Sequence, residues 1–240
     1  EIISLVNNKI GLGPNNILIS NFPNNAEQTI NIENAKLFIG NTALKIDDTD
    51  IYKKIKIDID NLEELQYIIY KLKENLNLKS KSLGFLINPE KKIHLESTFD
   101  KIFFHQVRRN VMDFSFNNLP NISKKMKGLG FGLTPSGDDF NSGILYGLNL
   151  LNTIEGIELS KLIDDCYQNS LGKNLISNTF LKFAYLNEYY DNFYNLMLSL
   201  KSKNSKTISY YRNRVIDSGH TSGSDMLTGF ILTLKGGLND

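Results

Sequence analysis

The amino-acid sequence predicts an α+β fold, in which a β-rich N-terminal half packs with a mainly α-helical C-terminal half. Polar and apolar residues alternate in short segments of the first half, which is the period of a half-buried strand. From about Phe99 onward the apolar residues recur at helical spacing. Strands followed by a run of helices are typical of α+β proteins. We therefore predict a β-rich domain over residues 1–110 and a helical domain over residues 111–240.

The strands of the first half are predicted from alternation and from turn signals. Residues 43–46 and 54–59 alternate most clearly, and residues 17–19 form a short apolar run between asparagine pairs. Residues 84–87 and 93–95 flank an Asn-Pro-Glu-Lys sequence. Two such segments around a turn sequence predict a hairpin.

One helix is expected to interrupt this half, over residues 62–76. Asn61 and Glu64 have the spacing of a capping box, and the apolar residues that follow form a stripe. We expect this amphipathic helix to cover one face of the sheet. Three further stripes predict helices in the second half, and they begin at Phe140, Leu159 and Leu227.

Composition excludes several classes of protein. Lys and Arg total 27 against 26 Asp and Glu, so the chain lacks the basic excess of a general nucleic-acid binder. Cys166 is the only cysteine, so no intramolecular disulfide can form, and its place on an apolar stripe predicts a core residue. No apolar run reaches the length of a membrane span, and residues 1–6 lack secretory features. We expect a cytoplasmic protein.

The most informative segment is residues 128–139, which read Gly-Leu-Gly-Phe-Gly-Leu-Thr-Pro-Ser-Gly-Asp-Asp. Its alternating glycines permit a close approach of the backbone to a ligand. Pro135 disfavours a helical Thr134, so a helix should begin after it, with Ser136 as N-cap and Asp139 completing a capping box. The free N–H groups of such a helix start suit an anion.

A second copy of this pattern makes it more informative. Residues 218–225 read Ser-Gly-His-Thr-Ser-Gly-Ser-Asp and also lead into an apolar stripe. Aligning Ser136 with Ser222 places Gly143 opposite Gly229, so both segments read Ser-Gly-x-Asp-x-x-x-Gly. Two well-capped helices with close packing would explain each copy alone. Because the pattern occurs twice, we favour two packed helices whose N-termini converge on one pocket.

Three residues are predicted to be catalytic. Asp138 and Asp139 are neighbours and would point about a quarter turn apart on a helix, so they make a poor acid–base pair with each other. One can cap the helix while the other faces a ligand or Mg²⁺, with Asp225 joining from the second helix. His220 lies in a loop, where histidine can donate a hydrogen bond or carry a proton. A histidine that only bonds backbone is an equal alternative.

The remaining site predictions concern binding. No zinc site is expected, because neither a cysteine nor a second histidine lies near His220. Lys127, Arg108 and Arg109 precede the first glycine loop and could supply positive charge, although solvation is the usual role of such residues. The predicted substrate-binding residues, all within the two motifs, are Gly130, Gly132, Thr134, Ser136, Gly137, Thr221, Ser222, Gly223 and Asp225.

Residues 128–139 and 219–225 resemble two motifs of a bacterial family first catalogued as a domain of unknown function and linked to the AllH subunit of oxamate carbamoyltransferase. Residues 177–184 resemble a third, weaker segment of that family. The resemblance covers roughly the second half of the chain. The first half is similar only in general character.

The resemblance implies carbamoyl transfer between oxamate and phosphate, with oxalurate and carbamoyl phosphate as the other reactants, as in anaerobic allantoin degradation. It also implies two further subunits, one similar to succinyl-CoA synthetase-type proteins. Both substrates are small anions, which a helix N-terminus can bind, and His220 or loop N–H groups could stabilise charge on the carbamoyl oxygen.

Two other functions fit the same residues. A non-catalytic subunit would bind a small anion or assemble its partners. A metal-dependent amide or phosphate hydrolase would use Asp138 and Asp225 as ligands. A homo-oligomer is also compatible with the sequence.

Overall fold

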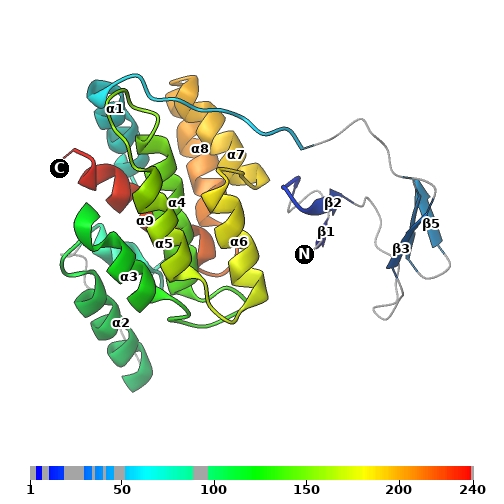
Figure 1. The fold of residues 1–240 in the computed structure, drawn as a ribbon, viewed down its shortest axis with the longest axis horizontal. Helices are drawn as coiled ribbons and strands as arrows, with labels where there is room; N and C mark the ends of the chain where they lie inside the picture. Colours follow the sequence, from blue (N-terminus) through cyan, green and yellow to red (C-terminus); the bar gives the residue numbers. More distant parts are fainter. Residues whose placement is uncertain are drawn as a thin grey trace.

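The computed structural model describes residues 4–6, 11–18, 30–33, 36–39, 42–45, 52–88 and 97–238. Helices dominate these residues (Figure 1). The α-helices are α1 (Leu62–Lys73), α2 (Thr98–Val111), α3 (Leu119–Met126), α4 (Ser136–Leu151), α5 (Ser160–Ser170), α6 (Leu175–Tyr185), α7 (Asp191–Lys201), α8 (Ser205–Ile216) and α9 (Ser222–Gly236). Two short 3-10 helices are η2 (Leu83–Leu86) and η3 (Phe116–Asn118).

The predicted α+β class is wrong, because the described chain contains little sheet. Its strands are three or four residues long: β1 (Ser4–Val6), β2 (Asn16–Leu18), β3 (Ile30–Glu33), β4 (Lys36–Ile39) and β5 (Thr42–Lys45). β1 and β2 pair in parallel, and β3, β4 and β5 form an antiparallel sheet in that order. The predicted strands at 17–19 and 43–46 overlap β2 and β5. The predicted hairpin turn from Pro89 onward, and its second strand at 93–95, lie outside the described residues.

Residues 54–59 explain the error. Ile57 and Ile59 are each 2% exposed, whereas Asp58 between them is exposed to solvent. However, this segment is extended without pairing to any described strand. It lies against helices instead, and Ile59 N donates a 3.0 Å hydrogen bond to Oγ1 of Thr153. The alternation therefore indicates one-sided burial of an extended chain and not a sheet. The predicted strand at 84–87 is likewise wrong, because it falls mostly in η2.

Helix α1 forms where it was predicted, but its packing differs. Oδ1 of Asn61 accepts from the N–H of Glu64 at 3.0 Å, which confirms the predicted cap. The Glu64 carboxylate accepts from Asp60 N at 2.9 Å, one residue before the position that a capping box requires. α1 packs against α8 and α9. The expectation that it covers a sheet is therefore wrong.

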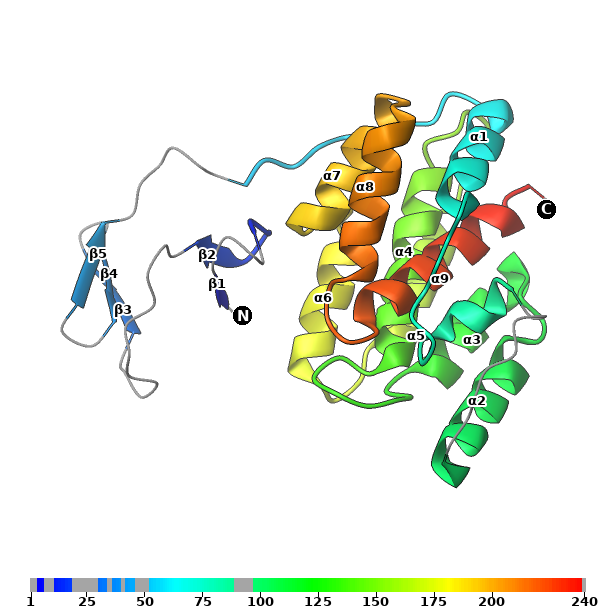
Figure 2. The same cartoon turned by 180° about the vertical axis from the view of Figure 1, so that it is seen from behind.

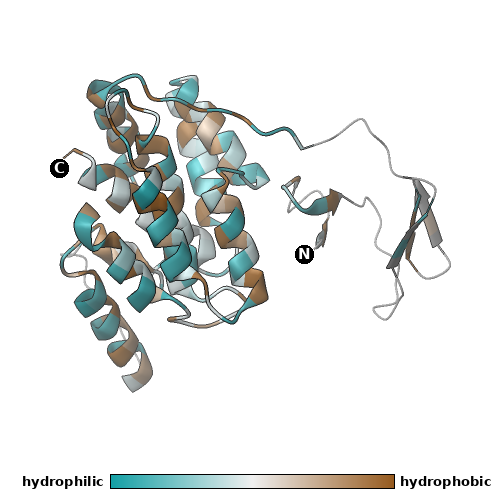
Figure 3. Cartoon of the chain, in the orientation of Figure 1, coloured by the Kyte–Doolittle hydropathy of each residue, from teal (hydrophilic) through white to brown (hydrophobic). Residues whose placement is uncertain are grey.

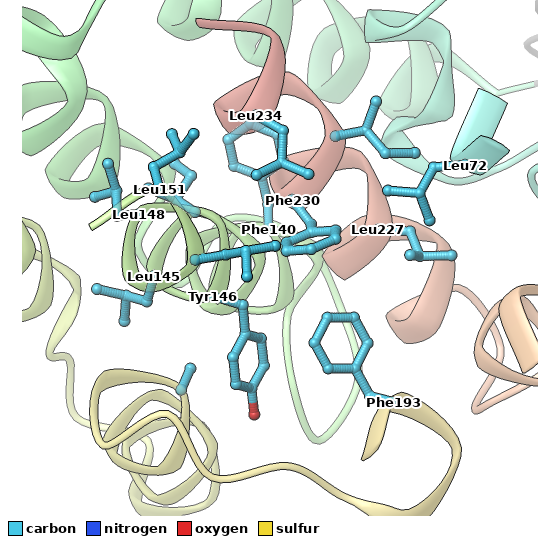
Figure 4. Packing of buried hydrophobic residues seen from close by; sticks show 14 of the residues in the cluster. Leu72, Phe140, Leu145, Tyr146, Leu148, Leu151, Phe193, Leu227, Phe230 and Leu234 are labelled. Atoms are coloured by element: carbon cyan, nitrogen blue, oxygen red, sulfur yellow. The ribbon is translucent and has the colours of Figure 1, made fainter. Parts of the chain in front are cut away.

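Helix α4 is the central element of the helical body. Every residue of α4 except Asn149 is buried, and α4 packs against α3, α5, α6 and α9 (Figure 2). A helix enclosed on all sides must be largely apolar or small, and the α4 sequence meets this condition. The surrounding helices carry separate hydrophilic and hydrophobic faces (Figure 3). The hydrophobic core gathers around the crossing of α4 with α9, where Phe140 and Phe230 lie close together (Figure 4).

Two glycines permit this crossing. A Cβ added to Gly143 would overlap the carbonyl oxygen of Met226, and a Cβ added to Gly229 would overlap that of Phe140. Each glycine thus lies against the backbone of the opposite helix. The contact is reciprocal, so the two helices are related by an approximate internal twofold axis.

The hydrophobic core is continuous across the predicted domain boundary. One cluster of buried side chains runs from Ile57 to Leu234 and includes residues on both sides of residue 110. Cys166 is fully buried in this cluster, as predicted, and burial raises the pKa of its thiol to about 12. Among the described helices, none is long and apolar enough to cross a membrane.

The reciprocal glycine contact predicts a large stability loss on adding one methyl group. Gly143→Ala and Gly229→Ala should each lower the free energy of unfolding by about 3 kcal/mol, because the rigid backbones must separate. Gly172→Ala is the matched control, since its Cβ would meet only the Lys127 side chain at 3.5 Å. The control should change stability by less than about 1 kcal/mol. Urea unfolding measures all three, and equal effects would contradict the proposed packing.

Candidate functional site

The structure brings the two Ser-Gly-x-Asp segments together. α4 begins at Ser136 and α9 at Ser222, directly after Pro135 and Thr221. Oγ1 of Thr134, in the first motif, lies 3.3 Å from Oγ of Ser222, in the second. Segments far apart in sequence thus meet at one place, next to the α4–α9 crossing.

The helix starts are not capped as predicted. Pro135 and Thr221 occupy the N-cap positions, and neither helix has a side-chain cap. Ser136 is the first residue of α4, so the predicted capping box with Asp139 is wrong. The influence of Pro135 on the start of the helix is confirmed. Instead of completing a capping box, Asp139 accepts from the Thr134 hydroxyl of the preceding loop, and Asp225 accepts from the distant Leu83 N–H.

Some backbone N–H groups in the first turns of α4 and α9 already donate hydrogen bonds within the protein. Gly137 N donates to the carbonyl of Leu129 at 2.8 Å, and Gly223 N donates to that of Ser218 at 3.1 Å. The N–H groups of Asp138 and Asp139 both donate to Pro135 O. On α9, the N–H groups of Ser222 and Ser224 have no acceptor among the described residues. The start of α9 therefore has more unused donors than the start of α4.

Asp138 holds the glycine loop. Its side chain is 4% exposed, and Oδ1 accepts a 2.6 Å hydrogen bond from Gly128 N. Gly128, Gly130 and Gly132 all have positive φ, which residues with a Cβ rarely adopt. The Asp138 carboxylate thus stabilises a turn that the glycines make sterically accessible.

Asp139 links the two motifs. Its Oδ2 accepts from Oγ1 of Thr134 at 3.2 Å, and the Ser222 hydroxyl lies close enough to lower the pKa of its carboxyl group. Asp139 is 8% exposed, and burial raises its pKa well above the ordinary value. The two hydroxyls offset part of this increase, while the charges of Asp225 and Asp138 add to it. Asp139 can therefore hold a proton at a higher pH than a solvated aspartate.

Asp225 occupies the equivalent position on α9. It is fully buried, and Oδ1 accepts a 2.6 Å hydrogen bond from Leu83 N. Burial raises its pKa to about 7, against the opposing effects of the Leu83 N–H and of the nearby Ser136 and Thr221 hydroxyls. Oδ2 has no hydrogen-bond partner among the described residues, although those hydroxyls lie close enough to lower the pKa.

A cavity of about 470 Å³ opens beside the start of α9. This volume is within the usual range for small-molecule sites. Asp139, Ser142 and Tyr146 line it from one face of α4, at helical spacing. β1 and β2, α6, and the starts of α7 and α9 supply other parts of the wall. Its lining from the two motifs consists of Thr134, Asp139, Ser218, Gly219, Ser222 and Gly223.

Arg214 supplies positive charge to this cavity. Its Nε donates to Oδ1 of Asn192 at 3.4 Å, and Nδ2 of Asn192 donates to Oγ of Ser218 at 3.2 Å. All three residues line the cavity. The cations suggested by the sequence, Lys127, Arg108 and Arg109, do not line it.

The predicted site residues are only partly brought together. Thr134, Asp139, Ser222 and Gly223 line the cavity. His220 is exposed in the loop before α9 and is not part of the cavity wall, although its neighbour Gly219 is. The other predicted residues lie behind the wall or in the loops, namely Gly130, Gly132, Ser136, Gly137, Asp138, Thr221 and Asp225.

Sequence reasoning missed several lining residues. Ser142 and Tyr146 follow Asp139 by three and seven residues, so their shared helical face could have been recognised. Arg214 lies eight residues before Ser222 on another helix, and nothing in its local sequence marks it. Among the described residues, no group of three or more His, Cys, Asp or Glu is placed to hold a metal ion.

Comparison with known families relates part of the chain to one family. Residues 126–234 match the model of the family described as oxamate carbamoyltransferase subunit AllH. The matched segment includes both Ser-Gly-x-Asp motifs and confirms the AllH-type resemblance. It relates this part of the chain to a carbamoyltransferase subunit. No curated protein and no solved structure matches the chain.

The raised pKa of Asp225 predicts a pH-dependent stability. The folded chain keeps a proton on this carboxyl up to about pH 7, whereas an unfolded aspartate releases it near pH 4. The free energy of unfolding should therefore fall as pH rises between these values. Asp225→Asn keeps an oxygen for the Leu83 N–H and should reduce this slope, which urea unfolding from pH 4 to pH 8 measures.

Asp225→Ala is the control for that measurement. It also removes the titrating group but leaves the buried Leu83 N–H without an acceptor. Its stability should be lower by about 1–3 kcal/mol at every pH, with the same reduced slope. If the free energy of unfolding of Asp225→Asn depended on pH as steeply as that of the wild type, Asp225 would not titrate in this range.

Proposed function

We propose that the chain is a carbamoyltransferase subunit, and that the cavity beside the start of α9 binds its small anionic substrates. In this proposal the reaction interconverts oxamate and carbamoyl phosphate with oxalurate and phosphate. The observation that carries the proposal is the shared cavity wall. There Thr134 and Asp139 of the first motif meet Ser222 and Gly223 of the second.

Three features of the cavity favour a small anion, although the wall also contains the Asp217 carboxyl. Arg214 provides a guanidinium group, which suits carboxylate and phosphate oxygens. The start of α9 adds the unused N–H of Ser222 and the positive end of a helix dipole. Burial raises the pKa of Asp139, which reduces the repulsion that an ionised carboxylate would exert on an anion.

The same groups can assist carbamoyl transfer. Negative charge develops on the carbamoyl oxygen during the reaction, and preorganised donors stabilise it. In our proposal the Ser222 hydroxyl and N–H are such donors, and Asp139 holds or accepts a proton. His220 stays in the proposal as a proton carrier on the loop that borders the cavity through Gly219. Asp138 acts indirectly by holding the glycine loop.

Cofactor and partners are part of the proposal. The described residues offer Mg²⁺ no protein cage, so any Mg²⁺ would enter with a phosphorylated substrate, as Mg²⁺ commonly does. Other carbamoyltransferase subunits would complete the enzyme. A purely assembling subunit would need no cavity of this composition. A metal-dependent hydrolase would need more metal ligands than Asp138 and Asp225, whose Oδ1 atoms bond to different loops.

Calorimetric titration of the full chain tests anion binding. Carbamoyl phosphate, oxamate and phosphate should each bind, and Arg214→Gln should weaken binding about 10-fold or more, as expected for a lost charged hydrogen bond. Arg109→Gln is the matched control, because it makes the same charge change on α2, away from the cavity. The titrations are repeated with Mg²⁺ and with a chelator.

The outcomes separate the alternatives. Equal weakening by both arginine variants would indicate a general charge effect and contradict the cavity as the binding site. Absence of binding would leave the assembling role. Turnover by the isolated chain that a chelator abolishes would favour the hydrolase.

A further inference from the structure

The two motifs occupy equivalent positions about the internal twofold axis. The same number of residues separates Ser136 from Ser222, Asp139 from Asp225, and Gly143 from Gly229. The packing repeats as well. A Cβ on Gly137 would overlap the carbonyl of Met126 near the end of α3, and a Cβ on Gly223 would overlap that of Val215 near the end of α8.

The hydroxyl contacts repeat in the same way. The Ser222 hydroxyl lies close enough to the Asp139 carboxyl to lower its pKa, and the Ser136 hydroxyl does the same for the Asp225 carboxyl. Each aspartate therefore faces the first residue of the opposite helix. The group that bonds to Asp225 therefore indicates what kind of ligand group Asp139 can bind.

The Asp225 side is closed by the chain itself. Residues 79–86 lie across the start of α9, and Oδ1 of Asp225 accepts from the backbone amide of Leu83 at 2.6 Å. Lys79 N also donates to Oγ of Ser224 at 3.3 Å, and Nζ of Lys79 donates to Gly219 O at 2.7 Å. A peptide amide of the protein thus occupies the space in front of this carboxyl.

The Asp139 side is open. Asp139 lines the 470 Å³ cavity, and no backbone N–H of the described chain donates to its carboxyl. It accepts a hydrogen bond from the Thr134 hydroxyl, and the Ser222 hydroxyl lies nearby. A carboxyl that is 8% exposed and borders a cavity has capacity for one more donor. On the other side of the axis, that donor is an amide.

We infer that Asp139 recognises the N–H of a small amide ligand, as Asp225 recognises the amide of Leu83. The ligand class is a primary amide that also carries a carboxylate or phosphate for Arg214. This inference rests on the proposed function and deepens it, because it names the group that distinguishes a carbamoyl compound from other small anions. Asp139 is then a specificity-determining residue of the cavity.

The test compares two anions of nearly equal shape. Oxamate carries an amide –NH₂ where pyruvate carries a methyl group, and both have one carboxylate for Arg214. The full chain should bind oxamate at least about 10-fold more tightly than pyruvate, because a hydrogen bond to a buried carboxyl is lost with pyruvate. Calorimetric titration gives the ratio of the two affinities.

Variants assign the preference to Asp139. Asp139→Ala should bring the oxamate-to-pyruvate ratio close to 1. Asp217→Ala is the control, because it removes another carboxyl from the cavity wall and should leave the ratio as in the wild type. Thermal melting confirms that each variant is folded, and the wild-type ratio tests the inference even if a variant does not fold.

The two proposals fail in different ways. Equal binding of oxamate and pyruvate, both weakened by Arg214→Gln, would overturn the amide recognition and leave the anion site standing. Loss of the preference in Asp217→Ala as well would overturn the assignment to Asp139. No binding of either anion would overturn both.

Discussion

The backbone contact between α4 and α9 at Gly143 and Gly229 is the constraint on which the site depends. Because no side chain separates the helices there, their first turns lie within reach of each other. Each aspartate lies one turn before its glycine and on the same face, so it must point toward the opposite helix start. The contacts among Thr134, Asp139 and Ser222 follow from this geometry. Helices held apart by ordinary side chains would not bring these groups together.

This arrangement has an energetic cost, since it buries two carboxyl groups. Burial disfavours the charged form, and the raised pKa values of Asp139 and Asp225 are the result. For Asp225 the cost is offset by the Leu83 N–H, which makes that carboxyl part of the fold. Asp139 lacks an equivalent amide donor and borders a cavity. Buried, cavity-lining carboxyls with perturbed pKa values are concentrated at functional sites.

The sequence predicted the local and periodic features best. Both helix starts and the glycine spacing could be read because they depend on neighbouring residues. The sheet could not be predicted correctly, since residues 54–59 show the same alternation on a helical surface as they would in a strand. The predicted capping box of Ser136 with Asp139 failed because Asp139 bonds to the Thr134 hydroxyl of the preceding loop instead. Arg214 reaches the cavity through the packing of α8, which no local pattern encodes.

The two motifs of this chain therefore have similar sequences but different roles. The alignment of the two motifs makes Ser136 and Ser222, or Asp139 and Asp225, equally good candidates for a binding site. Residues 79–86 remove that symmetry, because they fill the space at Asp225 with the protein's own backbone. The corresponding space at Asp139 remains a cavity with Arg214 in its wall. Both copies of the motif thus contribute to the helix crossing, while only the aspartate of the first copy borders the cavity.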